Sequence, residues 1–290
     1  MRQTRLRQVW QSIQGARVWT DEVGEGITRI RVTSRWARML GFEVSAYLVG
    51  DLLVDTGFAH VRQQVLSALE GWRIEAICCT HNHEDHTGNC GPLAAIHGCR
   101  VFIRNHGLRW GEGVRRLKPY RAWFWGEPGR FDAEEMPDEV VGRHRSLRAL
   151  PAPGHSITHV ALWEEATGTV FTGDLFISPG ASAVLIQENP YDLVDSLRRV
   201  AAVEPRLMLT GHGLAIEDPA PRLCTKADRV EATAARVVEL HQTGMKDRDI
   251  VREVFRGGNR RDRNIELLTQ GEFSRLNFIR AAVLHEPGRG

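Results

Sequence analysis

Residues 79–89 read CTHNHEDHTGN, and three histidines and two acidic residues fall within the six positions from His81 to His86. Imidazole and carboxylate groups are the usual protein ligands of Zn, Fe and Mn ions. If the backbone turns sharply here, His81 and His83 can converge on one ion, while Asp85 and His86 can serve a second ion nearby. One segment supplies only part of two coordination spheres. The pattern therefore predicts further ligands downstream, each at the end of a strand.

Three later motifs meet this expectation. His155 follows a predicted strand in LPAPGHSITH, Asp174 ends one in VFTGDLF, and His212 stands between two glycines in LMLTGHG. Glycine permits the sharp turns that would let such loops converge on one edge of a sheet. Isolated histidines are more often ordinary surface or core residues, which is how we interpret His106, His144 and His241.

Short apolar runs between turn residues predict the elements that position these side chains. In the first half they indicate strands at 26–32, 44–50, 51–57, 73–80 and 100–104 and helices at 60–71 and 90–98. The run at 73–80, RIEAICCT, leads the chain directly into the histidine cluster. The second half has a similar order, with strands at 146–154, 158–165, 168–176 and 206–213 and a helix at 189–205. This order predicts a layered α/β domain with the sheets inside and the helices outside.

Two regions depart from this alternation of strands and helices. Residues 107–140 predict an irregular stretch, whose aromatic side chains would either pack on the core or form a flap over a pocket: Trp110, Tyr120, Trp123, Phe124 and Trp125. After about residue 222 the pattern becomes helical, at 226–244, 246–258 and 272–284. We therefore expect a metal-binding domain at 1–222 and a helical C-terminal appendage at 223–290.

Composition limits the classes of protein and partner that fit. No apolar run is long enough for a membrane span, and the first fifteen residues lack the apolar centre of a secretory signal, so we expect a cytoplasmic protein without a membrane partner. Five cysteines without a C-x-x-C pair do not indicate a disulfide framework. The net charge of +2 gives no overall attraction for nucleic acid. Arginine clusters occur at 115–121, 142–148 and 256–263, but 35 of the 38 basic residues are arginine, which indicates a codon preference and weakens their meaning.

The motifs THNHEDH, PGHS, TGD and GHG, in this order and with LLVDTG upstream, resemble those of the metallo-β-lactamase superfamily over about residues 25–215. The resemblance implies an αβ/βα four-layer sandwich, here followed by the helical appendage. It also implies two metal ions, the first bound by His81, His83 and His155, the second by Asp85, His86 and His212, with Asp174 bridging the two. Asp55 matches a position that supports the ligand loop, and we place Thr80 in the same supporting role.

Departures from the motifs of known members indicate which branch of the superfamily the chain resembles. The best-known subclass of true β-lactamases carries cysteine at the position of Asp174, so hydrolysis of antibiotics is not expected. The oxygen-reducing di-iron members carry glutamate at the position of His83. Thioesterases of the glyoxalase II type place glutamate and tyrosine after the last Gly-His, whereas Gly213 and Leu214 follow His212 here. The chain therefore looks like a lactamase-like or glyoxalase II-like metallohydrolase of a generic branch that includes an endoribonuclease group and thioesterases.

The expected function is a binuclear-metal-dependent hydrolase of a small-molecule ester, thioester or lactone, with two Zn²⁺ ions, or Fe or Mn in their place, and a metal-bound hydroxide as nucleophile. Asp85 is both a ligand and a candidate catalytic residue that orients the nucleophile or moves its proton. Alternatives are a nuclease or phosphodiesterase of the same fold, a mononuclear-iron persulfide dioxygenase, and a metal-binding or regulatory protein without turnover. Nucleic acid is the less favoured partner, and exposed helix faces at 224–243 would suit a homodimer.

Overall fold

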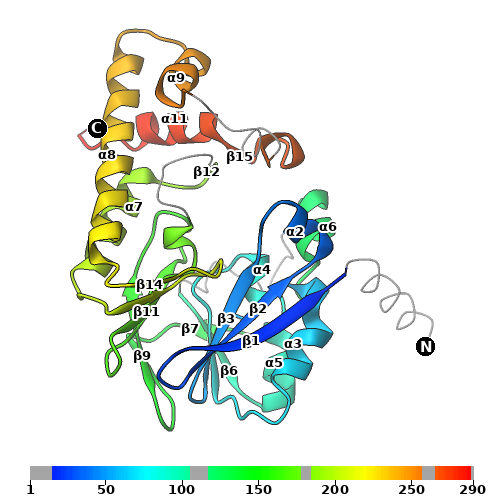
Figure 1. Cartoon of the computed structure of the whole chain (residues 1–290). Helices are drawn as coiled ribbons and strands as arrows, with labels where there is room; N and C mark the ends of the chain where they lie inside the picture. Colours follow the sequence, from blue (N-terminus) through cyan, green and yellow to red (C-terminus); the bar gives the residue numbers. More distant parts are fainter. Residues whose placement is uncertain (1–14, 105–116, 178–183, 257–264, 289–290) are drawn as a thin grey trace.

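A computed structural model describes residues 15–104, 117–177, 184–256 and 265–288, and its framework is two facing sheets (Figure 1). The first sheet holds seven strands in the order of the chain: β1 Arg17–Gly24, β2 Ile27–Thr33, β3 Val44–Val49, β4 Leu52–Val54, β5 Ala76–Cys78, β6 Arg100–Ile103 and β7 Glu134–Glu135. Strands β1 to β4 pair antiparallel, whereas β4 to β7 pair parallel. The sheet is therefore mixed.

The second sheet holds six strands in the spatial order β14-β13-β11-β10-β9-β8. Their bounds are β8 Glu139–Val141, β9 Ser146–Pro151, β10 Val160–Glu164, β11 Thr169–Phe171, β13 Leu207–Leu209 and β14 Ala215–Glu217. Only β11 and β13 pair parallel within this sheet. A separate pair joins β12 Val184–Leu185 to β15 Phe273–Ser274, so the C-terminal region contacts the segment that follows the second sheet's central strands.

Helices cover the outer face of each sheet. Helices α3 Arg62–Ala68 and α5 Cys90–His97 share a core with the first sheet, and α7 Pro190–Ala201 and α8 Ala220–Gln242 share one with the second. The shorter elements are α2 Arg35–Met39, η1 Ala59–Val61, α4 Glu84–Thr87, α6 Pro119–Trp125, η2 Gly173–Phe176, α9 Asp247–Val254 and α11 Arg275–Leu284. The predicted αβ/βα four-layer sandwich with C-terminal helices is confirmed.

A third apolar layer lies between the two sheets. Tyr47 and Val54 of the first sheet meet Leu162 and Phe171 of the second, and the Tyr47 and Phe171 rings lie 5.2 Å apart. Each such side chain stabilises the fold by about 1.5–3 kcal/mol when it is fully buried. The Tyr47 hydroxyl donates a hydrogen bond of 2.6 Å to the carbonyl of Thr210, two residues before His212. The inter-sheet core is therefore joined directly to one of the predicted ligand loops.

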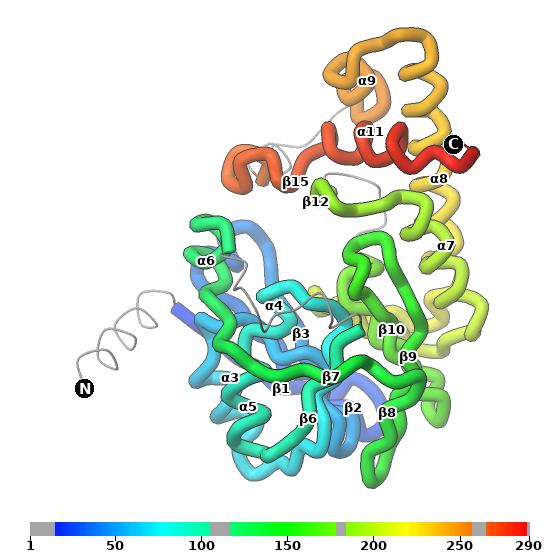
Figure 2. Tube along the Cα trace, turned by 180° about the vertical axis from the view of Figure 1, so that it is seen from behind, coloured from blue at the N-terminus to red at the C-terminus, as the bar shows by residue number. Residues whose placement is uncertain are grey.

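The predicted ligands all follow strands that point the same way. β4 and β5 are parallel neighbours, as are β11 and β13, and β9 runs in the direction of β11 because β10 is antiparallel to both. Carboxyl ends of such strands meet at one edge of the sheets. Helix α4 lies at this edge, on the side of the C-terminal helices, in both views (Figures 1 and 2).

The prediction of an irregular stretch at 107–140 is wrong in part. Residues 117–118 lead into helix α6, with Pro119 in its first turn, and β7 and β8 follow. Proline suits that position because the missing N–H has no helical partner there. The Trp123 and Trp36 rings lie 4.9 Å apart, and the Trp125 and Phe58 rings 5.0 Å. These aromatic residues therefore pack on the domain, whereas Trp110 lies outside the described residues.

The C-terminal helices share a core with the second sheet. Helix α8 begins at Ala220, and its buried residues Ala227 and Val230 belong to the same apolar cluster as Leu197 of α7 and Phe278 of α11. Figure 2 shows α8 along α7, with α9 and α11 beyond it. Among the residues that the structure describes, none of the helices has the length and apolar character that a membrane crossing requires.

Candidate metal centre

The structure brings all seven predicted ligands to the shared edge of the sheets, in two groups. Within each group, one ligand atom per residue lies within 4.8 Å of every other. The first group is His81, His83, His155 and Asp174, and the second is Asp85, His86, Asp174 and His212. The grouping is the one that the family resemblance implies for two ions.

Asp174 is common to both groups, and its two oxygens face different histidines. Asp174 Oδ2 lies 3.4 Å from His155 Nε2 and 4.0 Å from His81 Nε2. Asp174 Oδ1 lies 3.2 Å from His86 Nε2 and 3.3 Å from His212 Nε2. This arrangement suits a carboxylate that bridges two cations.

Buried polar atoms without partners show that the residues fit cations. Among the described residues, the Nε2 atoms of His81 and His86 and the Oδ1 atom of Asp174 are buried and accept or donate no hydrogen bond. Such atoms are rare in native structures because desolvation without a partner costs free energy. Their position on the inner side of both groups fits two divalent cations held by imidazole and carboxylate.

Two glycines allow the loops to approach so closely. A Cβ atom on Gly211 would lie 2.6 Å from His86 Cε1 and 2.8 Å from Asp174 Oδ1. Gly173 has φ of +45°, and a Cβ atom there would lie 2.5 Å from Thr80 Oγ1. A larger residue at Gly211 would displace candidate ligands directly, and one at Gly173 would displace Thr80 and His159.

Asp55 and Thr80 both contact candidate ligands. Asp55 follows β4 with φ of 57°, and its carboxylate accepts hydrogen bonds of 2.8 Å from the Thr80 backbone N–H, from Thr80 Oγ1 and from His86 Nδ1. Thr80 Oγ1 lies 3.1 Å from His81 Nδ1. Hydrogen bonds on Nδ1 leave Nε2 of both histidines free for a metal.

Sequence reasoning missed the partners of two other ligands. Glu188 Oε1 lies 3.2 Å from His155 Nδ1, and the backbone carbonyl of Glu43 accepts from His212 Nδ1 at 2.7 Å. Neither partner belongs to a motif, and both are far along the chain from the histidine they contact. A carbonyl acceptor has no side-chain signal at all.

His83 is held differently from the other histidines. His83 Nδ1 lies 3.1 Å from His155 Nε2 on the inner side, and His83 Nε2 lies 3.3 Å from Gln187 Nε2. His83 therefore presents Nδ1 to the first group, while the other four histidines present Nε2.

Burial and neighbouring charges shift the pKa values of the candidate ligands in ways that bear on cation binding. Burial lowers the pKa of His81 and His83 well below the usual value, so both stay neutral and keep a lone pair for a metal. Burial alone would raise the pKa of Asp174, but His212 and His86 hold it well below its usual range. Burial would lower the pKa of His212, yet Asp174 raises it to about 9. Cations at the site would therefore displace protons from the second group.

A buried histidine outside the motifs orients Asp174. His159 Nε2 accepts a hydrogen bond of 3.1 Å from the Asp174 backbone N–H. Burial lowers the pKa of His159 to about 3, so the ring is neutral and can accept this bond. No motif in the sequence separates His159 from an ordinary core histidine.

Lys226 of α8 reaches the loop behind Asp174. Its Nζ donates a hydrogen bond of 3.2 Å to the Leu175 carbonyl and lies 4.9 Å from the centre of the Phe176 ring. The side chain is buried, and burial lowers its pKa to about 8. At neutral pH the folded protein therefore carries a buried ammonium group. Keeping this group charged costs more free energy in the folded protein than in the unfolded chain.

This lysine gives a pH-dependent stability. Between about pH 8 and pH 10, Lys226 is deprotonated in the folded protein but still protonated in the unfolded chain. The contribution of Lys226 to the free energy of unfolding should therefore rise over this range by at most about 3 kcal/mol. Lys226→Met should remove that rise relative to wild type, as measured by urea denaturation at both pH values. The exposed Lys246→Met should keep it. An equal rise in the Lys226 variant would contradict the assignment.

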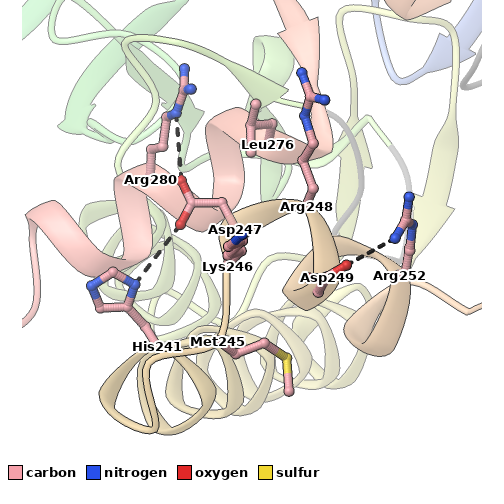
Figure 3. Close-up of a pocket in the computed structure, with 9 residues that line it drawn as sticks. All are labelled: His241, Met245, Lys246, Asp247, Arg248, Asp249, Arg252, Leu276 and Arg280. Carbon is pink, nitrogen blue, oxygen red and sulfur yellow. Dashed lines mark hydrogen bonds and ion pairs between the residues drawn. The ribbon is translucent and has the colours of Figure 1, made fainter.

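A cavity of about 620 Å³ lies away from this centre, among the C-terminal helices (Figure 3). Asp247 lies 3.9 Å from both His241 and Arg280 across it, and Asp249 pairs with Arg252 at 2.8 Å. None of the predicted ligands lines the cavity. It is therefore separate from the candidate metal centre.

Known proteins share both sequence and fold with this chain. A hydroxyacylglutathione hydrolase of Rhodospirillum rubrum is 29% identical over 61% of this chain and 64% of the relative. A beta-lactamase-like protein 2 homolog of Drosophila melanogaster is 27% identical over 65% and 68%. An atrochrysone carboxyl ACP thioesterase of Aspergillus fumigatus is 26% identical over 67% and 58%. The chain thus spans only about 60–70% of the length of these relatives.

Solved structures agree on the fold. A beta-lactamase domain protein from Burkholderia ambifaria has a TM-score of 0.63 at 20% identity, over 91% of this chain and 86% of that one. A protein solved in a di-iron-bound form is 26% identical with a TM-score of 0.51, over 65% of this chain and 94% of that one. The family model of the metallo-beta-lactamase superfamily matches residues 40–212, which include all seven candidate ligands, and the chain belongs to this superfamily.

Proposed function

We propose that this protein is a metal-dependent hydrolase that cleaves a thioester of a small molecule. The observation that carries the proposal is Asp174, whose two oxygens face two separate ligand groups. Two divalent cations bound there would acidify a shared water and polarise an acyl carbonyl. Zn²⁺ is the first candidate for this ligand set, Fe is an alternative that the di-iron relative supports, and Mn also suits imidazole and carboxylate ligands.

The relatives favour sulfur as the leaving atom. One relative is named as a hydrolase of hydroxyacylglutathione and another as a thioesterase of an acyl carrier protein. Both names describe release of an acyl group, which supports a thioester over a lactone or a simple ester. The residues after His212 are Gly213 and Leu214, so the pattern of the glyoxalase II type is not reproduced and glutathione is not assigned as the carrier.

Asp85 is the residue best placed to move a proton. Its carboxylate is buried in the second group, and Oδ2 lies 3.7 Å from His86 Nε2. A carboxylate there can orient a water molecule and accept its proton as the acyl carbon is attacked. The proton can then pass to the departing sulfur. We therefore propose for Asp85 the proton-transfer role that the sequence analysis expects.

Several described arginines of the basic clusters are paired with acids. Arg121 contacts Glu84 at 2.7 Å, and Arg145 contacts Glu164 at 3.1 Å. Arg143 lies 3.1 Å from Glu75. A surface that binds nucleic acid needs cations that are free to neutralise phosphates. These pairs therefore support a small-molecule substrate over RNA or DNA.

Large aliphatic side chains are exposed close to the ligands in sequence. Ile157 and Ile186 are both 66% exposed, and Leu214 is 40% exposed. Ile157 follows His155 by two residues, and Ile186 precedes Gln187, which contacts His83. Exposed apolar residues beside a polar site favour a ligand with an apolar part. An apolar acyl chain meets that requirement.

Ile186→Asp should therefore weaken binding of long acyl chains selectively. We expect KM to rise about tenfold for an octanoyl thioester, which corresponds to about 1.4 kcal/mol of lost apolar contact, and to change little for an acetyl thioester. Ile96→Asp on α5, also exposed, is the matched control and should leave both KM values unchanged. Equal changes for the two substrates would contradict an acyl-binding role.

Metal analysis combined with a substrate panel tests the proposed function. The purified protein should contain two divalent ions, hydrolyse S-acyl substrates, lose activity in a chelator and regain it with Zn²⁺. Preferred cleavage of a phosphodiester with a steep salt dependence would support the nuclease alternative instead. Oxygen consumption with a persulfide and a single iron would support the dioxygenase alternative.

A further inference from the structure

A buried carboxylate lies in the ligand turn itself. Glu84 stands between His83 and Asp85 in the chain and is only 2% exposed, although it belongs to neither ligand group. Glu84 Oε1 accepts a hydrogen bond of 2.7 Å from Arg121 Nη1, and Arg121 is 8% exposed. A buried charge pair of this kind is costly to break because it leaves the other partner uncompensated. Arg121 of α6 therefore fixes the turn from outside.

Arg121 is in turn held by the C-terminal region. Arg121 Nε lies 3.4 Å from Glu272, whose carboxylate also accepts from the Tyr120 hydroxyl and lies 3.2 Å from Lys118 Nζ. Glu272 directly precedes β15, and its side chain is largely buried. The two carboxylates and two cations of this cluster balance in charge. A chain of contacts thus runs from Glu272 through Arg121 and Glu84 to the ligand turn.

The same C-terminal segment reaches the first ligand group by a second route. Phe273 of β15 pairs with Leu185 of β12, and the Leu185 backbone N–H donates 3.0 Å to Glu188 Oε1, the atom that contacts His155 Nδ1. Asn277 Nδ2 donates 3.2 Å to the Val184 carbonyl. Segment 272–277 therefore contacts Arg121, which holds the turn that carries His83 and Asp85, and the β12 segment, which holds the partner of His155. Figure 2 shows β15 and β12 side by side above the edge that carries α4.

We propose that Glu272 is a positioning residue of the metal centre, and that segment 272–277 holds the ligands of the first group in their binding geometry through Arg121–Glu84 and through β12. The C-terminal region then contributes to metal binding by holding the ligands in position. The inference shares metal binding with the proposed function but does not depend on the substrate. Its readout is metal binding rather than hydrolysis.

The test measures Zn²⁺ affinity of the metal-free full-length chain by competition with a chromogenic chelator, together with the visible spectrum of the Co²⁺ form. Glu272→Gln should weaken binding of one of the two ions about fivefold and shift the Co²⁺ bands, since the geometry of one group changes. Glu266→Gln, an exposed acid six residues earlier, should leave both unchanged. Arg121→Lys keeps the charge but lacks the fork that reaches both carboxylates, so it should reproduce the spectral shift.

A double variant that restores the net charge of the cluster separates an effect on ligand position from an effect of charge on the bound ion. Glu272→Gln leaves one extra positive charge, which by itself would disfavour a nearby cation. Adding Lys118→Met restores the balance of charge but not the ion pair with Arg121. If positioning is responsible, the double variant keeps the weak affinity and the shifted spectrum; recovery of both overturns the proposal.

Two other outcomes also overturn it. One is a Glu272→Gln variant that binds both ions with wild-type affinity and spectrum, even if its melting temperature falls. The other is a wild-type chain that binds no ions, which also removes the proposed function. A wild-type chain that binds two ions without hydrolysing thioesters would refute the proposed function alone.

Discussion

Asp174→Ala is expected to remove binding of both ions and to reduce thioester hydrolysis at least ~1000-fold. The reason is geometric: among the described residues, Asp174 is the one member common to both groups, with one oxygen 3.4 Å from His155 and the other 3.3 Å from His212. Removing it leaves each group one ligand short. Metal content by elemental analysis and kcat/KM with an S-acyl substrate are the measurements.

The fold should survive this substitution. Asp174 lies on the η2 turn at the sheet edge, and none of the three apolar layers includes it. Circular dichroism should therefore match wild type. Asp192→Ala, which removes an exposed acid from the first turn of α7, is the matched control and should retain both ions and full activity. Full hydrolysis by a metal-free Asp174 variant would refute the mechanism.

The positions of the candidate ligands were predictable because each follows the end of a strand. A buried apolar run leads straight into His81, and His155, Asp174 and His212 each follow another such run beside glycine. The direction of the strands then brings these residues together, since β5, β9, β11 and β13 all end at one edge. Local sequence therefore contained most of the information about the fold and the metal centre.

The supports of the ligands were not predictable in the same way. Glu188 contacts a histidine 33 residues away, and the Arg121–Glu272 contact spans 151 residues. A single charged residue with one distant partner leaves no periodic pattern in the chain. Tertiary contacts also explain α6, where Trp123 and Trp125 pack on α2 and Phe58 although the sequence there lacks a helical repeat. Strand β1 was missed because none of its residues is buried and half of them are polar.

Asp55→Asn should weaken metal binding about 10–100-fold while keeping the backbone conformation, since asparagine tolerates the positive φ of 57° at this position. The Asp55 carboxylate accepts three hydrogen bonds, two from Thr80 and one from His86 Nδ1. An amide has one acceptor oxygen, so its NH₂ group must face a donor in either orientation. If the NH₂ group faces the Thr80 N–H, the hydrogen bond from that N–H, which holds the ligand turn, is lost.

Facing His86, the amide favours the tautomer with hydrogen on Nε2, the atom that must bind the metal. Both orientations therefore lower the affinity, which Zn²⁺ competition with a chelator will measure. Asp51→Asn is the matched control, because Asp51 is also buried and accepts backbone N–H groups from Arg143 and His144, away from the ligands. It should lower the free energy of unfolding but leave the metal affinity unchanged. Equal losses of affinity in the two variants would mean that Asp55 acts through general stability and not through His86.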